Sequence, residues 1–184
     1  MNGMSKISKF LSLILRHKPD AIEVNLDESG WVDIAELVEK SRKAGVNINP
    51  DLIRKIVATS DKQRFAISED GLRIRANQGH SITVNLDLEE AKPPQQLYHG
   101  TATHNLAAIR QQGLIKGNRQ YVHLSPDKET AEIVGKRYGK PVVLTIHADR
   151  MHQAGIKFYL SVNGVWLTDY VPKEYITGAK KGIE

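Results

Sequence analysis

Arginine and histidine occur together in the first half of the sequence in a pattern that suits phosphate binding. Arg16 and His17 precede Lys18-Pro19, and Arg64, Arg73 and Arg75 follow later in the same half. A guanidinium binds a phosphate through two parallel hydrogen bonds, so several arginines that converge near one histidine would form a phosphate site. These residues also have an ordinary interpretation, because basic side chains often compensate the dipole at a helix C-terminus or lie on solvated strands.

In the second half, histidines stand beside small hydroxyl residues. The segments are His99-Gly100-Thr101 and His123-Leu124-Ser125. Their side chains would offer hydrogen-bond donors and acceptors to sugar hydroxyls, and a glycine after a strand lets a ligand approach the backbone. Each motif is short, and a single histidine is by default a surface or core residue.

Metal binding is not expected from the spacing of the histidines. His99 and His104 are five positions apart, as are His147 and His152, so neither pair shares one face of a helix, and no cluster of carboxylates accompanies them. The chain has no cysteine, which excludes disulfides, thiolate nucleophiles and iron–sulfur clusters. We therefore predict no metal.

The composition indicates a folded globular protein. The 184 residues are 40% hydrophobic and 26% charged, with a formal net charge of +5. That charge favours an anionic partner such as a nucleic acid. No apolar stretch approaches the roughly 20 residues needed to span a bilayer, so we expect a cytoplasmic protein without a membrane partner.

The first half predicts three helices followed by a β-hairpin. The expected elements are a helix from Ser8 to Arg16 with Ser8 as N-cap, an extended segment over residues 22–26, a short strand at residues 31–32, helices that begin after Asp33 and at Pro50, and a hairpin over residues 65–75. By analogy of fold, this order is that of a winged-helix module, which mostly binds nucleic acid.

The second half predicts a sheet-rich lobe. The expected strands cover residues 97–101, 121–125, 142–146, 156–160 and 165–168. The expected helices cover residues 105–112 and 129–137. Regular long crossover helices and phosphate-binding glycine motifs do not occur, so the predicted class is α+β. A polar segment with the Pro-Pro pair places a linker at residues 91–96 between lobes at residues 1–90 and 97–178, with a frayed tail at residues 179–184.

Several short motifs follow one another in an informative order between about Ser8 and about Thr177. They are Ser8-Lys9-Phe10-Leu11-Ser12, Leu15-Arg16-His17-Lys18-Pro19, Gly30-Trp31, Thr59 to Phe65, Arg75-Ala76-Asn77-Gln78-Gly79-His80-Ser81, Leu97-Tyr98-His99-Gly100-Thr101 and His123-Leu124-Ser125. As a set they resemble the NAD-dependent RNA 2′-phosphotransferase family. The resemblance implies an N-terminal winged-helix RNA lobe and a C-terminal ADP-ribosyltransferase-like mixed-sheet lobe, with the reaction at the cleft between them.

The resemblance also implies the reaction, which removes an internal 2′-phosphate of the splice-junction type from RNA. The phosphate displaces nicotinamide from NAD⁺ to give an ADP-ribosylated RNA phosphate. The 2″-hydroxyl then attacks phosphorus, and 2′-OH RNA and ADP-ribose 1″,2″-cyclic phosphate are released. The implied partners are NAD as co-substrate and RNA, with no metal and no obligate protein partner.

Site residues carry over from the family by position. The catalytic group corresponds to Arg16, His17, Arg64 and Arg119, and the residues that bind NAD correspond to His99, Gly100, Thr101, Ile109, Gly113, His123 and Ser125. His17 would either hydrogen-bond the phosphate or protonate the departing 2′-oxygen, and the sequence does not choose between these roles.

Two other functions stay open. The chain could be a winged-helix regulator that binds nucleic acid and senses NAD or ADP-ribose through its second lobe, and such a protein would release no nicotinamide. It could also transfer ADP-ribose to nucleic-acid termini, which would leave a stable adduct. Protein ADP-ribosylation is disfavoured, because the late segment Asn163 to Leu167 carries no carboxylate.

Overall fold

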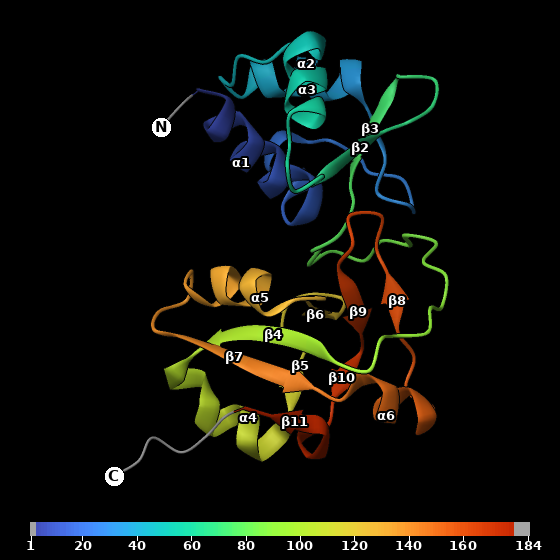
Figure 1. The fold of residues 1–184 in the computed structure, drawn as a ribbon. Coiled ribbons are helices and arrows are strands. Elements are labelled where there is room, and N and C mark those ends of the chain that lie inside the picture. The colour runs from blue at the N-terminus through green and yellow to red at the C-terminus, as the bar shows by residue number, and fades with distance from the viewer. Residues whose placement is uncertain (1–2, 179–184) are drawn as a thin grey trace. The chain divides into compact units, whose positions relative to one another are not determined.

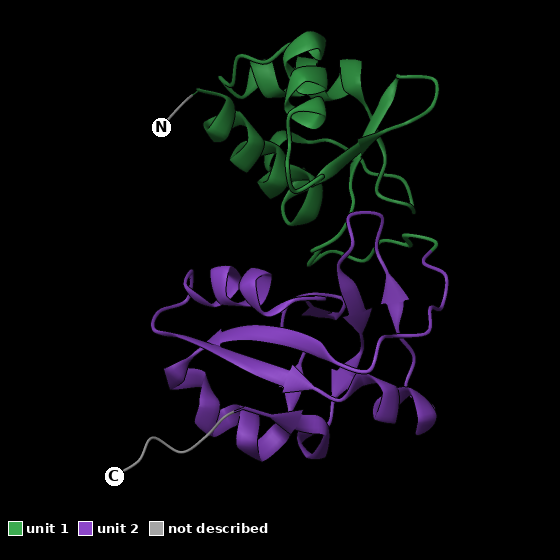
Figure 2. Ribbon diagram, viewed as in Figure 1, with its two compact units in different colours: residues 1–87 green, residues 88–184 purple. Residues whose placement is uncertain are grey.

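The chain divides into two units, residues 1–87 and residues 88–184 (Figure 2). A computed structural model describes residues 3–178. Each unit combines helices with antiparallel strand pairs (Figure 1). Each also has its own hydrophobic core. The predicted α+β class is therefore confirmed. The expected frayed tail at residues 179–184 lies outside the described residues.

Unit 1 contains the expected helices, with one boundary corrected. Its helices are α1 (Gly3–Arg16), the 3₁₀ helix η1 (Pro19–Ile22), α2 (Ile34–Lys43) and α3 (Pro50–Ala58). The prediction that Ser8 caps the first helix is wrong, since α1 begins at Gly3 and Ser8 lies inside it. Met4 and Ile7 pack against the core, so the apolar stripe of α1 begins before Ser8.

Side-chain caps begin α2 and α3 where the sequence predicts them. The Asp33 carboxylate accepts hydrogen bonds from the backbone N–H groups of Ala35 at 2.7 Å and Glu36 at 3.2 Å. The Asn49 side chain accepts from the Leu52 N–H at 2.8 Å. These oxygens satisfy N–H groups that have no partner within the helix.

Three short strands complete unit 1 in the order β1-β3-β2: β1 (Val32–Asp33), β2 (Phe65–Ile67) and β3 (Arg73–Ala76). The predicted hairpin is confirmed by the antiparallel pairing of β2 and β3. The predicted extended segment at residues 22–26 is wrong, because η1 ends at Ile22 and Glu23 has a left-handed φ of 57°. Ile22 and Val24 are nevertheless buried.

Unit 2 is built from short strands and short helices. The strands are β4 (Leu97–Ala102), β5 (Leu114–Ile115), β6 (Val122–Leu124), β7 (Pro141–Ile146), β8 (Tyr159–Leu160), β9 (Trp166–Thr168), β10 (Tyr170–Val171) and β11 (Ile176–Thr177). The helices are α4 (Leu106–Gln112), α5 (Lys128–Gly135), α6 (Ala148–Gln153) and the 3₁₀ helices η2 (Thr103–Asn105) and η3 (Lys173–Tyr175).

The strands of unit 2 pair as β11-β7-β4, β6-β9-β8 and β10-β5. Reciprocal backbone hydrogen bonds of 2.9 and 2.7 Å between Tyr98 and Ser125 connect β4 to the end of β6. His99 and His123 therefore come from neighbouring segments, although they are far apart in the sequence.

Candidate functional site

Arg16 and Arg64 meet in unit 1. Arg16 is the last residue of α1, and its Nη2 donates a hydrogen bond to the Arg64 carbonyl at 3.3 Å. Its guanidinium also lies 5.9 Å from the centre of the Phe65 ring. His17 follows Arg16 and is exposed, while Arg64 is half-buried. His17 and Arg64 line the same groove, so the structure brings these three predicted residues together.

The segment Asn77–Ser81 fixes this cluster in place. The Ser81 N–H donates to the Arg16 carbonyl at 2.9 Å, and the Ser81 hydroxyl lies 2.9 Å from Nδ1 of His17. The Asn77 N–H donates to the Arg64 carbonyl at 2.9 Å. The sequence alone predicts no separate role for this segment. The only signal for it was its presence among the motifs that carry the family resemblance.

His80 is buried beside the cluster. Its exposed fraction is 1%, and no residue in the described chain pairs with either ring nitrogen. Burial, helped by the positive charges of Arg16, His17 and Arg75, lowers the pKa of His80 from 6.5 to about 4. His80 is therefore neutral at pH 7 and adds no charge to the cluster.

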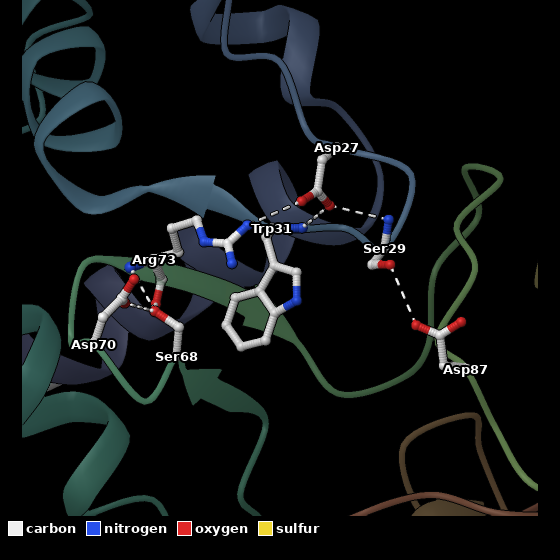
Figure 3. Close-up of polar contacts among 7 residues, drawn as sticks. All are labelled: Asp27, Ser29, Trp31, Ser68, Asp70, Arg73 and Asp87. Carbon is white, nitrogen blue, oxygen red and sulfur yellow. Dashed lines mark hydrogen bonds and ion pairs between the residues drawn. The ribbon is translucent and has the colours of Figure 1, made fainter.

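Arg73 and Arg75 lie along one face of β3 and contact Trp31. Their guanidinium carbons are 5.6 and 4.6 Å from the centre of the indole ring. The Asp27 carboxylate accepts hydrogen bonds from the Arg73 guanidinium at 3.4 Å and from the backbone N–H of Trp31 at 2.8 Å (Figure 3). Arg73 thus connects β3 to the turn before β1, which supports its ordinary structural interpretation.

His99, one of the predicted NAD-binding residues, is hydrogen-bonded to the neighbouring segment of unit 2. Its Nδ1 donates to the His123 carbonyl at 3.0 Å, since a carbonyl can only accept. Burial lowers the pKa of His99, and the positive charge of Arg119 lowers it further, while the hydrogen bond to His123 opposes the shift. A neutral His99 with its proton on Nδ1 keeps Nε2 as an acceptor.

Arg119 joins the same group from the loop before β6. Its Nη1 lies 2.7 Å from Nδ1 of His123. A guanidinium can only donate, so this contact leaves the neutral His123 ring with its proton on Nε2. Thr101, on β4, is buried and accepts from the Asn105 amide at 3.1 Å. The structure therefore brings Arg119 to the predicted residues His99 and His123.

Both predicted site glycines, Gly100 and Gly113, lie where packing leaves no room for a side chain. A Cβ on Gly100 would lie 1.6 Å from the Ala131 carbonyl oxygen, because α5 packs directly on β4. Gly100 lies inside the strand and not in a turn after it, which corrects the expected position. Gly113 has a φ of +77°, and a Cβ there would lie 2.2 Å from the Val171 carbonyl oxygen.

Ile109 is a core residue of unit 2, with an exposed fraction of 9%. Ser125 is half-buried and takes part in the backbone pairing with Tyr98. For Gly100, Gly113, Ile109 and Ser125, the contact with NAD stays a prediction.

Within residues 3–178, no three His, Asp or Glu side chains are grouped in a way that could hold a metal ion. None of the described helices is both long enough and apolar enough to cross a bilayer.

Comparison with known proteins agrees with the motifs. Residues 2–170 match the model of the "RNA 2′-phosphotransferase, Tpt1 / KptA family". The chain is 52% identical over 175 residues to a probable RNA 2′-phosphotransferase of Flavobacterium johnsoniae, which is 95% of this chain and 96% of that protein. It is 55% identical over 171 residues to the protein of that name from Rhodopirellula baltica, with 92% and 93% covered. The chain therefore belongs to the RNA 2′-phosphotransferase, Tpt1 / KptA family, as its motifs predict.

Proposed function

We propose that this protein is an enzyme that removes an internal 2′-phosphate from RNA by transferring it to NAD⁺. The observation that carries the proposal is the cluster of Arg16, His17 and Arg64 in unit 1, in a chain whose relatives are called RNA 2′-phosphotransferases. The Arg16 guanidinium is held by its hydrogen bond to the Arg64 carbonyl, and guanidinium groups are well suited to bind a phosphate and to stabilise charge on its oxygens.

Unit 1 would bind the RNA. Its three helices and the β1-β3-β2 sheet support the winged-helix interpretation, and the side chains of Arg16, His17 and Arg64 would contact the 2′-phosphate. The contact between Nδ1 of His17 and Ser81 leaves Nε2 as the nitrogen that can face the phosphate or the 2′-oxygen.

Unit 2 would bind NAD⁺, as an ADP-ribosyltransferase-like lobe does. His99 and His123 present an acceptor and a donor nitrogen, respectively, and Thr101 and Ser125 carry hydroxyls on the adjoining segments. This donor set suits the ribose hydroxyls and the amide of a nicotinamide nucleoside. Gly100, Ile109 and Gly113 would support this site from within the fold.

The proposed chemistry needs little proton transfer in its first step. An oxygen of the 2′-phosphate, already an anion, attacks C1″ of the nicotinamide ribose, and the C–N bond breaks as nicotinamide leaves with the electron pair. In the second step the 2″-hydroxyl attacks phosphorus and loses its proton. The P–O2′ bond breaks, and the 2′-oxygen takes up a proton for which His17 is the candidate donor. Arginines stabilise the charge that develops on the phosphate oxygens.

Mass spectrometry of the products from a 2′-phosphorylated RNA and NAD⁺ tests this proposal. We expect 2′-OH RNA, nicotinamide and ADP-ribose 1″,2″-cyclic phosphate in equal amounts, also in the presence of EDTA, because the proposed reaction uses no metal. Binding without release of nicotinamide would favour the regulator. A stable ADP-ribose adduct at an RNA terminus would favour the alternative function, the transfer of ADP-ribose to nucleic-acid termini.

A further inference from the structure

We propose that a groove along α1 of unit 1 binds the ribose-phosphate backbone of the RNA strand that flanks the 2′-phosphorylated nucleotide. This inference rests on the proposed function and specifies how its RNA substrate is held. The groove has a volume of about 530 Å³ and lies between α1 and the segment from the end of α3 to β2. That volume is within the range of sites for ligands of nucleotide size.

The groove begins at the candidate phosphate site. His17, just after α1, and Arg64, just before β2, both line it. An internal 2′-phosphate held by these two residues belongs to a nucleotide whose strand continues on both sides. The groove provides a continuous surface that leads away from that phosphate.

The charge of the groove suits a polyanion. Lys9 on α1 and Lys62 in the loop before β2 line it and are exposed, and Asp61 is the one carboxylate among its lining residues. Lysines that meet phosphates release the counterions condensed on the nucleic acid, which favours binding without reading the base sequence.

Hydroxyl groups add short hydrogen-bonding side chains to the same surface. Ser8 and Ser12 lie one turn apart on α1 and both line the groove, but the Ser12 hydroxyl donates to the Ser8 carbonyl at 2.9 Å, so only Ser8 offers its proton here. Ser60, on the opposite side, has a buried Oγ that meets no hydrogen-bond partner in the described chain. A buried hydroxyl of this kind gains from a phosphate or ribose oxygen that accepts its proton.

The outer face of α3 is the alternative surface, because a winged-helix module commonly inserts its third helix into a groove of nucleic acid. That face is partly neutralised here. Arg54 pairs with the Asp51 carboxylate at 3.4 Å and also donates to the Gly71 carbonyl at 3.5 Å. The groove along α1 is lined by His17 and Arg64, two of the candidate catalytic residues, so it is the better site for the strand.

The double variant Lys9→Ala/Lys62→Ala tests the groove with two substrates. One is a 2′-phosphorylated dinucleotide, and the other is a longer single strand that carries the same 2′-phosphate internally. With NAD⁺ saturating, we expect the KM of the longer strand to rise roughly tenfold, with an unchanged kcat and an unchanged KM for the dinucleotide. The slope of log affinity for the longer strand against log salt concentration should decrease in magnitude by about 1.4, the value for the loss of two phosphate contacts with a single strand.

Lys6→Ala/Lys55→Ala is the matched control, because these two lysines are exposed on α1 and α3 and do not line the groove. It should leave all of these quantities unchanged. The inference is overturned if the first double variant leaves the KM of the longer strand unchanged, if both substrates weaken equally, or if the control variant weakens the longer strand as much.

Direct binding separates this inference from the proposed function. If the wild-type protein turns over neither substrate, the proposed function fails. Fluorescence anisotropy with the labelled longer strand still measures whether the loss of Lys9 and Lys62 weakens binding and the control does not.

Discussion

Nδ1 of His17 lies 2.9 Å from the hydroxyl of Ser81, whose backbone N–H donates to the carbonyl of Arg16 at 2.9 Å. One residue therefore orients the ring of His17 and anchors the end of α1. Ser81 is therefore a positioning residue for the proposed chemistry. It acts by holding His17 and need not touch the substrate.

We expect Ser81→Ala to lower kcat roughly tenfold while the KM for NAD⁺ stays unchanged, because the His17 ring loses the partner that orients it. Ser81→Thr, which keeps the hydroxyl, should recover most of the activity. Steady-state kinetics of the three proteins checks this, with Thr83→Ala at a nearby exposed position as the control. Equal losses in the alanine and threonine variants would contradict an orienting role for the hydroxyl.

Arg64→Ala should impair the second chemical step more than the first, because only the second must stabilise new charge at phosphorus. Loss of one such donor typically costs about 10²- to 10³-fold in rate. A quenched time course on a gel should therefore show the ADP-ribosylated RNA accumulating. Arg64→Lys should recover little, because an ammonium lacks the two-pronged geometry of the guanidinium. Normal turnover without a trapped adduct in Arg64→Ala would remove Arg64 from the site.

His80 should make the stability of the protein depend on pH. Its pKa is about 4 in the folded state and near 6.5 when unfolded, so between these values the unfolded chain binds more protons. The free energy of unfolding should fall as the pH decreases from 6.5 to 4, by up to about 3 kcal/mol from this residue. Urea unfolding at several pH values checks this. His80→Gln should remove that part of the slope, and His104→Gln, at an exposed position, should retain it.

The sequence predicted the elements whose signals are local. Asp33 and Asn49 cap their helices and the hairpin forms where expected, because each depends on a few adjacent residues. The segment at residues 22–26 differs from its prediction. Its alternation of apolar residues resembles a strand, but the 3₁₀ helix that begins at Pro19 extends to Ile22. Helix α6 is not among the predicted elements, because its six residues are too few for a clear helical pattern.

The candidate site was predictable only in part. Arg16, His17 and Arg64 stand in recognisable motifs. The restraints on them come from Ser81 and Asn77, and those restraints depend on how the chain returns past α1 after β3. The tight contact at Gly100 depends likewise on how α5 packs on β4, and the residues near Gly100 do not predict that packing.

Gly100→Ala should destabilise unit 2, because its Cβ would lie 1.6 Å from the Ala131 carbonyl oxygen and the backbone has to move. Overpacking that forces the backbone to shift typically costs about 1 to 3 kcal/mol and occasionally more, and we expect this variant at the upper end because the overlap is with backbone. Gly117→Ala is the control, since a Cβ there meets nothing within 4 Å and only its φ of +60° opposes the change. That control should cost about 1 to 2 kcal/mol. Denaturant unfolding of both variants gives the comparison.

Arg119→Ala should raise the KM for NAD⁺ roughly tenfold. Nη1 of Arg119 lies 2.7 Å from Nδ1 of His123, and without this charged donor the His123 ring is no longer held in one tautomer. Lys116→Ala, three positions earlier and paired with Asp169 at 3.6 Å, should leave that KM unchanged. Initial rates at varied NAD⁺ check this. An unchanged KM in Arg119→Ala would separate Arg119 from the NAD site.

The carbonyl of Arg64 accepts hydrogen bonds from both the Arg16 guanidinium and the Asn77 N–H. Since this acceptor belongs to the main chain, replacing the Arg64 side chain does not remove the anchor of Arg16. Arg16→Ala, in contrast, removes the hydrogen bond to that carbonyl, so in a double-mutant cycle only the Arg64 substitution leaves the link between the two residues in place.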